Sequence, residues 1–315
     1  MTNASLLQLP LPGDPDALWI LDLSSWVRGL WELIKPPAND LADRTVVLAT
    51  VRRLVGLLGT ERPARLVAAV DSRLPPWQAA LWPSYKAGRP QPGLGYWEQL
   101  RVVREVLTLH NIPSVEVDGF QADDVIATIT RKARAAGLRV VLITKDHDLW
   151  QLVEDGGLVV AWGGGKDDPV VDVAAVAKRY FGLHPRQLVD MMALAGDSDE
   201  APGLPGIGDK TAAQLITKRG SLDEALRKYA WEKGKLSATL RDGGDLARLS
   251  RELVTLRDAP MSFELDDAIV GWDAHAAWKI RVMGEKLGSE VMQQAEDMAP
   301  VVTKGELAKL QESEA

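Results

Sequence analysis

Residues 139–148 read RVVLITKDHD, an apolar run rich in β-branched residues that ends abruptly in two acids. Two other segments have the same pattern, because LWILD ends at Asp22 and LVAAVD ends at Asp71. Short apolar runs of this kind predict buried strands. In an open α/β sheet the acids would then lie at the carboxyl ends of the strands, where such folds hold their ligands.

Strand patterns alternate with helical patterns from about Leu18 to Ala161. The expected strands are Leu18–Leu23, Arg65–Val70, Val115–Val117, Arg139–Ile143 and Leu158–Val160, and helices between them include Arg44–Leu58, Tyr96–Leu109 and Ala122–Ala136. Strands separated by helices of this length indicate βαβ units. The predicted fold class is therefore α/β, with a mainly parallel central sheet and helices on both of its faces.

From about Val173 onward the strand pattern gives way to helical patterns alone. The expected helices are Val173–Phe181, Arg186–Ala195, Lys210–Lys218 and Leu246–Leu256. Gly- and Pro-rich breaks separate them, as is typical of short connections. We therefore expect an α/β core over residues 1–172, a helical lobe over residues 173–270 and a helical tail over residues 271–315.

The composition favours a soluble cytoplasmic protein. The chain has 315 residues, 46% hydrophobic and 26% charged, and it contains no cysteine, which excludes disulfides and thiolate sites. Its start has no basic segment before an apolar run, and no stretch approaches the roughly 20 apolar residues that span a membrane. The net charge of −7 argues only superficially against a nucleic-acid partner, because bound divalent ions would reverse the local sign.

Acidic residues gather at the predicted strand ends and helix starts. The candidate metal ligands are Asp22, Asp71, Asp123, Asp124, Asp146, Asp148 and Asp197, with Asp199 as an eighth. Any single one could be a helix N-cap. A cap needs one acceptor, however, so the second acid of the Asp123–Asp124 and Asp146–Asp148 pairs is surplus to structure. Asp124 points to a different face of its helix from Asp123, which leaves open that Asp124 is the structural acid.

A pocket of carboxylates needs cations. Two ionised carboxylates about 4 Å apart repel by roughly 4 kcal/mol at an effective dielectric near 20. Hard oxygen ligands without a Cys or His partner point to Mg²⁺ or Mn²⁺.

Residues 202–213 read PGLPGIGDKTAA and predict a phosphate-binding turn. Gly206 and Gly208 flank Ile207, so the backbone can turn tightly and approach an anion closely. A helix that begins at about Asp209 offers the anion its positive end. The alternative is a plain helix–helix turn, and the spacing is not that of a P-loop.

Residues 83–92 read PSYKAGRPQP. Lys86 and Arg89 lie three residues apart, so both would line one face of a short helix. Cations that face a pocket of metal and carboxylate suit a phosphodiester in its transition state, where charge gathers on oxygen. Tyr85 and nearby tryptophans could stack on unpaired bases.

These segments, in this order, resemble the 5′-nuclease family, which contains flap endonucleases and the 5′–3′ exonuclease domain of bacterial DNA polymerase I. The resemblance runs from about Leu18 to Asp258. GFQADDV and LITKDHDLWQL resemble the acidic signature of the family. PSYKAGRP resembles the start of its helical arch, here about residues 77–96, and PGLPGIGDKTA its helix–hairpin–helix motif, here residues 202–219. No polymerase follows, so the chain resembles a stand-alone form.

The resemblance implies roles for individual residues. It assigns Asp22, Asp71 and Asp123 to one metal ion. It assigns Asp146, Asp148 and the acids of Gly196–Asp199 to a second, with Asp123 near both. Lys86, with Arg89 beside it, would contact the scissile phosphate. A hairpin that often binds K⁺ in the family would hold the duplex through Gly206, Gly208, Lys210 and Thr211.

The function that the resemblance implies is that of a metal-dependent 5′ nuclease. It would hydrolyse DNA at 5′ flaps, nicks, gaps and 5′ ends, as a flap endonuclease and 5′–3′ exonuclease in DNA replication and repair. Two or more Mg²⁺ or Mn²⁺ ions would serve a monomeric enzyme. One alternative is a branched-DNA binding module with a degraded catalytic site. A weaker one is a metal-dependent ribonuclease, against which the Gly206–Thr211 hairpin argues.

Two departures from the family pattern bear on these assignments. Gln121 stands where the family usually has Glu, and its oxygen can ligate or hold a metal-bound water but brings no charge. The first metal site should therefore be weaker. The acidic loop GDSDEAPG is one residue shorter than the pattern, so that either Asp197 or Asp199 could be the ligand.

Overall fold

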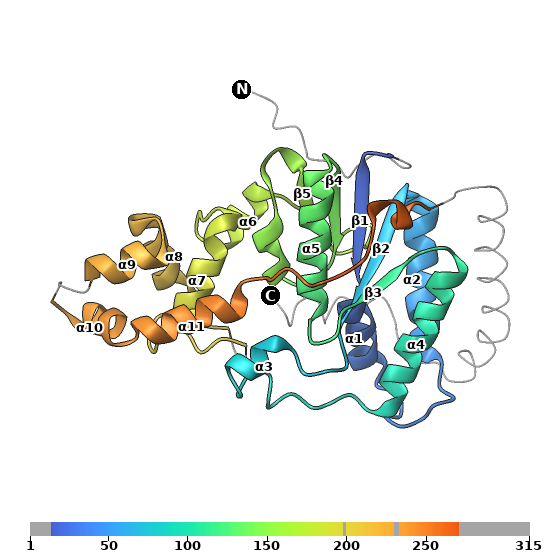
Figure 1. Ribbon diagram of the computed structural model, residues 1–315, viewed down its shortest axis with the longest axis horizontal. Coiled ribbons are helices and arrows are strands. Elements are labelled where there is room, and N and C mark those ends of the chain that lie inside the picture. Colours follow the sequence, from blue (N-terminus) through green and yellow to red (C-terminus); the bar gives the residue numbers. More distant parts are fainter. Residues whose placement is uncertain (1–13, 198–199, 230–232, 271–315) are drawn as a thin grey trace. The chain divides into compact units, whose positions relative to one another are not determined.

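The computed structural model describes residues 14–197, 200–229 and 233–270, which include a six-stranded sheet. The strand order is β3-β2-β1-β4-β5-β6, and each neighbouring pair from β3 to β5 is parallel, whereas β6 runs antiparallel to β5. The strands are β1 (Ala17–Asp22), β2 (Arg65–Val70), β3 (Ser114–Glu116), β4 (Arg139–Ile143), β5 (Val159–Trp162) and β6 (Val170–Val171). Figure 1 shows β1 beside β2 and β4 in the middle of the sheet.

The central strand β1 is buried along its whole length. It pairs with β2 from Leu18↔Arg65 to Asp22↔Ala69, and with β4 up to Leu21↔Ile143. A strand buried on both faces is expected to be apolar throughout, as the near-continuous hydrophobic run of β1 is. The register brings the ends of β1, β2 and β4 to the same edge of the sheet.

The described residues form two compact units. The first comprises residues 14–25, 63–91 and 112–269, and the second comprises residues 26–62 and 92–111 with Val270. The second contains most of α1 (Leu23–Ile34), together with α2 (Thr45–Glu61) and α4 (Leu94–Leu109). The sheet, α3 (Trp77–Leu81) and α5 (Ala122–Ala135) belong to the first unit, where α5 packs against β1, β2 and β4.

The first unit also contains the helical lobe. Its helices are α6 (Val173–Arg179), α7 (Leu188–Ala195), α8 (Asp209–Arg219), α9 (Leu222–Tyr229), α10 (Lys235–Asp242) and α11 (Gly244–Val254). Helix α7 packs against α8 and α11, and α9 packs against α8 and α10 (Figure 1). Short 3-10 turns, Asp148–Leu152, Asp155–Gly157, Pro185–Gln187 and Leu265–Ala268, complete the described elements.

The loop that follows α7 requires glycine at Gly203. Its φ is +59°, in the left-handed region, and a Cβ there would lie 2.3 Å from the backbone nitrogen of Gly196. Gly196 has a φ of +81°. The two glycine backbones therefore touch, and a side chain at Gly203 would push them apart.

The structure confirms the predicted α/β fold with a mainly parallel sheet and a helical lobe. Residues 82–89 differ from expectation, because they form turns rather than a helix that would carry Lys86 and Arg89 on one face. Lys86 itself has a φ of +51°, which a right-handed helix does not allow. The expected tail over residues 271–315 lies outside the described residues.

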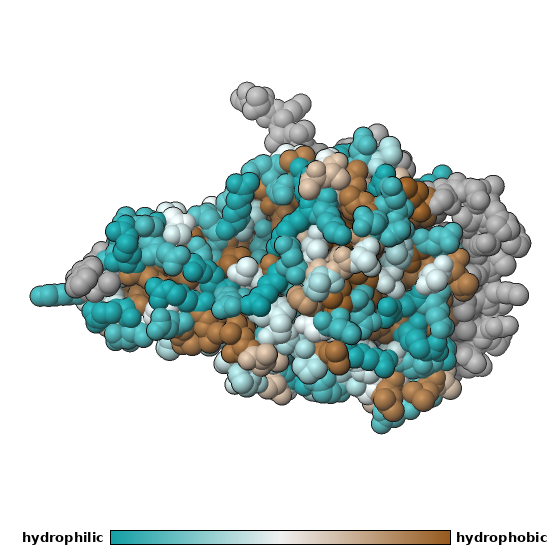
Figure 2. Space-filling view, viewed as in Figure 1, coloured by the Kyte–Doolittle hydropathy of each residue, from teal (hydrophilic) through white to brown (hydrophobic). Residues whose placement is uncertain are grey.

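None of the described helices is long and apolar enough to cross a membrane. In the view of Figure 2, hydrophilic side chains cover much of the surface, with apolar residues in smaller areas between them.

Candidate active site

Asp22 ends the central strand and is buried, with 2% of its surface exposed. Its Oδ1 accepts a hydrogen bond from the backbone N–H of Ser25 at 3.0 Å, and its Oδ2 accepts one from the hydroxyl of Thr144 at 2.8 Å. Burial raises the pKa of Asp22 to about 7, and Asp146 raises it further, although these hydrogen bonds oppose the shift. The site thus keeps a carboxyl group where ionisation is costly.

Asp71 and Asp123 join Asp22 from the neighbouring elements. Asp71 follows β2, and its Oδ1 accepts from the backbone N–H of Ala122 at 2.8 Å, which caps the start of α5. Asp123 lies in the first turn of α5. Burial raises the pKa of Asp123 well above its ordinary value, and the charges of Asp146 and Asp22 add to this. These acids therefore share one electrostatic environment.

Asp124, the neighbour of Asp123, has a different role. Its Oδ2 accepts from the indole N–H of Trp77 at 2.8 Å, and its Oδ1 accepts from the backbone N–H of Arg257 at 2.7 Å. The guanidinium of Arg257 stacks over the Trp77 ring, 3.4 Å from its centroid. Both oxygens of Asp124 thus bind structural donors, so we assign Asp124 to the packing of α3 and the segment after α11 rather than to a metal site.

Asp146 and Asp148 follow β4. The backbone N–H of Asp146 donates to the Thr144 hydroxyl at 3.0 Å, and that of Asp148 donates to Oδ1 of Asp146 at 2.9 Å. Burial raises the pKa of both carboxyl groups. For Asp148 the charges of Asp146, Glu200 and Asp197 raise it further, which links these two acids to the loop after α7.

The loop after α7 brings two more carboxylates to the site. Asp197 and Ala201 are joined by two reciprocal backbone hydrogen bonds of 3.0 Å. The carboxylate oxygens of Asp148, Asp197 and Glu200 lie within 4.8 Å of one another. Asp199 lies outside the described residues, so its competition with Asp197 stays open.

The turn after α3 adds cations to the acidic cluster. The Lys86 ammonium lies 2.9 Å from Oε1 of Glu200, and the Arg89 guanidinium lies 2.8 Å from the same oxygen. Burial acts to lower the pKa of Lys86, but Glu200 and Asp123 outweigh it and hold that pKa above its usual value. Lys86 is therefore a cation at the edge of the cluster.

Tyr85 is buried, and its hydroxyl lies between Gln121 and Glu200. Its hydroxyl donates to Oε1 of Gln121 at 2.5 Å and lies 3.2 Å from Oε2 of Glu200. Burial first, and then Glu200 and Asp123, raise the pKa of this hydroxyl, so it stays protonated. A side chain that is only 6% exposed does not offer its ring to a nucleic-acid base, which corrects the stacking role expected from the sequence.

The residues that meet here suit divalent cations. In the part of the chain that the structure describes, the close trio contributes only carboxylate oxygens, which are the ligands that Mg²⁺ and Mn²⁺ prefer. Burial first, and then the charges of neighbouring carboxylates, raise the pKa of Asp22, Asp123, Asp146 and Asp148, and bound cations would relieve both effects.

The predicted phosphate-binding turn forms at the start of α8. Gly206 has a φ of +78° and Gly208 is the N-cap residue, while Ile207 between them is buried. The first N–H groups of a helix have no partner within the helix, and Gly208 has no side chain to cap them. Gly206, Gly208 and Lys210 are exposed, and Thr211 is half-buried, so this turn is open to a ligand.

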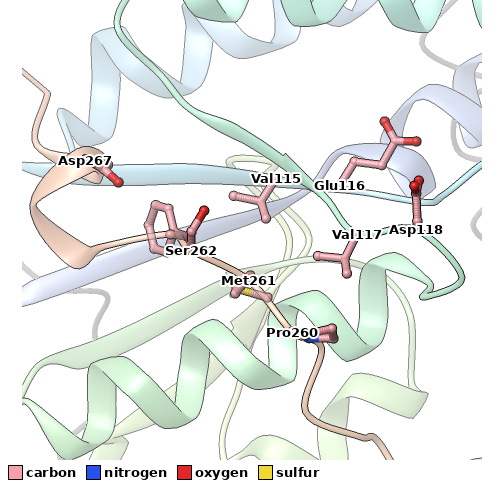
Figure 3. A pocket seen from close by; sticks show the side chains of 9 residues that line it. Val115, Glu116, Val117, Asp118, Pro260, Met261, Ser262 and Asp267 are labelled. Carbon is pink, nitrogen blue, oxygen red and sulfur yellow. The ribbon is translucent and has the colours of Figure 1, made fainter.

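A separate cavity of about 640 Å³ lies elsewhere in the first unit (Figure 3). Val115 and Glu116 of β3 and the segment around Met261 line it. None of the acids described above lines this cavity, so we do not connect it with the active site.

Glu200, Thr144 and the hydrogen bond between Tyr85 and Gln121 were not predicted from the sequence. Glu200 was visible in GDSDEAPG as a third acid of that loop. The contact of Tyr85 with Gln121 joins residues 36 positions apart, and no local pattern indicates it.

The raised pKa of Asp22 predicts how pH affects the stability of the metal-free protein. An unfolded Asp releases its proton near about pH 3.9, whereas folded Asp22 retains it to about pH 7. The contribution of Asp22 to stability should therefore fall as pH rises through this window. We expect the Tm in EDTA, measured relative to Asp22→Asn, to decrease between about pH 5 and about pH 8. A difference that stays constant or grows would contradict the burial of this acid.

The adjacent pair Asp123 and Asp124 provides a matched comparison. Asp124→Asn should leave one buried donor unpaired and lower the free energy of unfolding by about 1–3 kcal/mol, without changing Mn²⁺ affinity. Asp123→Asn should weaken Mn²⁺ binding and leave the metal-free protein at least as stable. Urea unfolding in EDTA would measure the stability of each variant, and calorimetric titration its Mn²⁺ affinity. Equal losses of Mn²⁺ affinity in the two variants would refute the separate roles of Asp123 and Asp124.

Comparison with known proteins accounts for this combination of fold and site. Residues 18–181 match the family described as 5′-3′ exonuclease, N-terminal resolvase-like domain, and residues 183–276 match the 5′-3′ exonuclease, C-terminal SAM fold. The chain is 34% identical over 241 residues to a 5′-3′ exonuclease of Aquifex aeolicus, a match that covers 76% of this chain and 81% of that protein.

The DNA polymerases I are longer relatives. That of Rhizobium leguminosarum is 34% identical over 264 residues, which are 83% of this chain and 24% of the polymerase. The chain thus spans about a quarter of the length of this curated relative.

Among solved structures, a T5 5′-exonuclease with bound zinc superposes with a TM-score of 0.61 at 18% identity, over 86% of this chain and 98% of that chain. A T5 flap endonuclease in complex with DNA and metal ions superposes with a TM-score of 0.59 at 18% identity, over 85% and 99%. These structures share the fold. The two family matches and the Aquifex relative show that the chain belongs to the 5′-3′ exonuclease family.

Proposed function

We propose that this protein is a divalent-metal-dependent 5′ nuclease that hydrolyses phosphodiesters of DNA at 5′ flaps, nicks, gaps and 5′ ends. The observation that carries the proposal is the convergence of carboxylates from the ends of β1, β2 and β4, the start of α5 and the loop after α7. Mg²⁺ or Mn²⁺ would be held by Asp22, Asp71, Asp123, Asp146, Asp148, Asp197 and Glu200. When bound, such ions supply a hydroxide nucleophile and stabilise the leaving oxygen.

The other parts of the site would bind and orient the DNA. Lys86 and Arg89 lie against Glu200 at the edge of the acids, where they could take the oxygens of a phosphate. The exposed N–H groups at the start of α8, with Lys210 and Thr211, suit the backbone of a duplex. We propose that the lobe of residues 173–270 contacts the duplex and that the core of residues 1–172 cleaves it. K⁺ is a candidate ion at the Gly206–Thr211 hairpin.

The alternative of a degraded DNA-binding module rested on Gln121 and the short acidic loop. Glu200 weakens that alternative, because it brings a carboxylate to the Tyr85 hydroxyl that the neutral Gln121 side chain also contacts. The relatives named as a 5′-3′ exonuclease and as a flap endonuclease support a cleaving enzyme. We further propose that the protein acts as a cytoplasmic monomer in DNA replication and repair.

Asp146→Asn and Asp148→Asn test the proposal directly. Each should reduce cleavage of a 5′-flap substrate in Mn²⁺ by about a hundredfold or more, while DNA binding changes little. The control is Asp155→Asn, since Asp155 is exposed and pairs with His184 outside the acidic cluster. Near-normal turnover in both site variants would rule out metal-dependent cleavage at these acids. If the wild type shifts the DNA in a gel without cutting it, the protein is a DNA-binding module.

The hairpin should govern binding instead of cleavage. Lys210→Ala should weaken duplex binding and reduce the slope of log K against log salt by about 1, because one fewer phosphate contact releases counterions. Lys218→Ala, exposed near the other end of α8, is the matched control. If the slope of Lys210→Ala equals that of the wild type and of the control, Lys210 does not contact the DNA.

A further inference from the structure

One tyrosine hydroxyl lies between the amide of Gln121 and the carboxylate of Glu200. The Tyr85 hydroxyl is 2.5 Å from Oε1 of Gln121 and 3.2 Å from Oε2 of Glu200. A phenol has a single proton, so it can donate fully to only one of these oxygens at a time. The shorter distance places that hydrogen bond on Gln121.

Among the described residues, Gln121 makes no side-chain hydrogen bond other than the one with Tyr85. It is the N-cap residue of α5, yet its side chain makes no capping hydrogen bond. Asp71 does that work by accepting from the N–H of Ala122. The Gln121 side chain is therefore committed to Tyr85, and its neutral oxygen accepts the proton without adding a negative charge.

Glu200 supplies the negative charge beside the Tyr85 hydroxyl. One of its oxygens holds Lys86 and Arg89, and its carboxylate lies with those of Asp148 and Asp197. Its side chain is only 17% exposed, so water screens it little. A carboxylate at position 121 would compete with Glu200 for the single proton of the Tyr85 hydroxyl. The carboxylate without that proton would be repelled by the other acids of the cluster.

We propose, on the basis of the proposed nuclease function, that Gln121 and Glu200 are a matched pair in which Glu200 carries the carboxylate charge and Gln121 the neutral acceptor. The acid that the family pattern has at position 121 is thus replaced by one at position 200, and the Tyr85 hydroxyl connects the two positions. The exchange moves the carboxylate charge from the start of α5 to the loop after α7, beside Asp148 and Asp197.

A double-mutant cycle on the full chain tests the pair, with Mn²⁺ alone as the probe. Glu200→Gln should weaken Mn²⁺ binding by about tenfold or more, and Gln121→Glu added to it should restore most of the affinity. Gln121→Glu alone should lower the Tm in EDTA by a few degrees, and the double variant should regain it. Glu105→Gln, an exposed carboxylate on α4, should change neither quantity.

Tyr85→Phe keeps the ring and removes the connecting hydroxyl. In that background the effects of the two substitutions on Tm and on Mn²⁺ affinity should become independent. This second cycle keeps the test valid if Gln121→Glu alone folds poorly.

The pair is overturned if Glu200→Gln binds Mn²⁺ within about twofold of the wild type, or if the double variant binds no better than Glu200→Gln. Asp146→Asn separates this failure from that of the function. If Asp146→Asn loses Mn²⁺ binding while the effects of Gln121→Glu and Glu200→Gln simply add, the nuclease proposal is retained, and the proposed pairing of Gln121 with Glu200 is wrong. If the wild type itself binds no Mn²⁺, both fall.

Discussion

The repulsion between buried carboxylates is the constraint on which the rest of this structure depends. Asp22, Asp123, Asp146 and Asp148 lie where burial raises the pKa of each and where their charges act on one another. Such a cluster lowers the stability of the metal-free fold. The parallel sheet makes it unavoidable, since the ends of β1, β2 and β4 meet at one edge.

Several features of the chain offset this cost. Ser25 and Thr144 donate hydrogen bonds to Asp22, and the N–H of Ala122 donates to Asp71. Lys86 and Arg89 reach the cluster from a turn in which Lys86 adopts a left-handed backbone conformation. Strained backbone of this kind is typical of functional sites, where the surrounding contacts hold it in place. The remaining excess of negative charge is what divalent cations would neutralise.

The sequence predicts much of this arrangement because its signals are local. A β-rich run that ends in an acid indicates both a strand and the position of its carboxylate, and Asp22, Asp71 and Asp146 follow this rule. The glycines around Ile207 likewise indicate the turn before α8. Asp124 shows where local reasoning stops, because its two partners, Trp77 and Arg257, come from distant segments.

The contacts among Tyr85, Gln121 and Glu200 could not be predicted in this way. They join a turn, a helix start and a loop that are far apart in the sequence, and only the fold brings them together. The turn that carries Lys86 is a different case. Its three-residue spacing from Arg89 suggests a helix, but the local residues Pro83, Gly88 and Pro90 favour turns.

The central claim is that these carboxylates form the metal-binding centre of a nuclease. Anomalous diffraction from crystals soaked in Mn²⁺ tests it most directly, because the scattering locates the ions without reference to activity. Peaks are expected beside Asp22, Asp123 and Asp146, and beside Asp148, Asp197 and Glu200. Saturating Mn²⁺ that gives no peak at these acids, or peaks only elsewhere on the molecule, would contradict it.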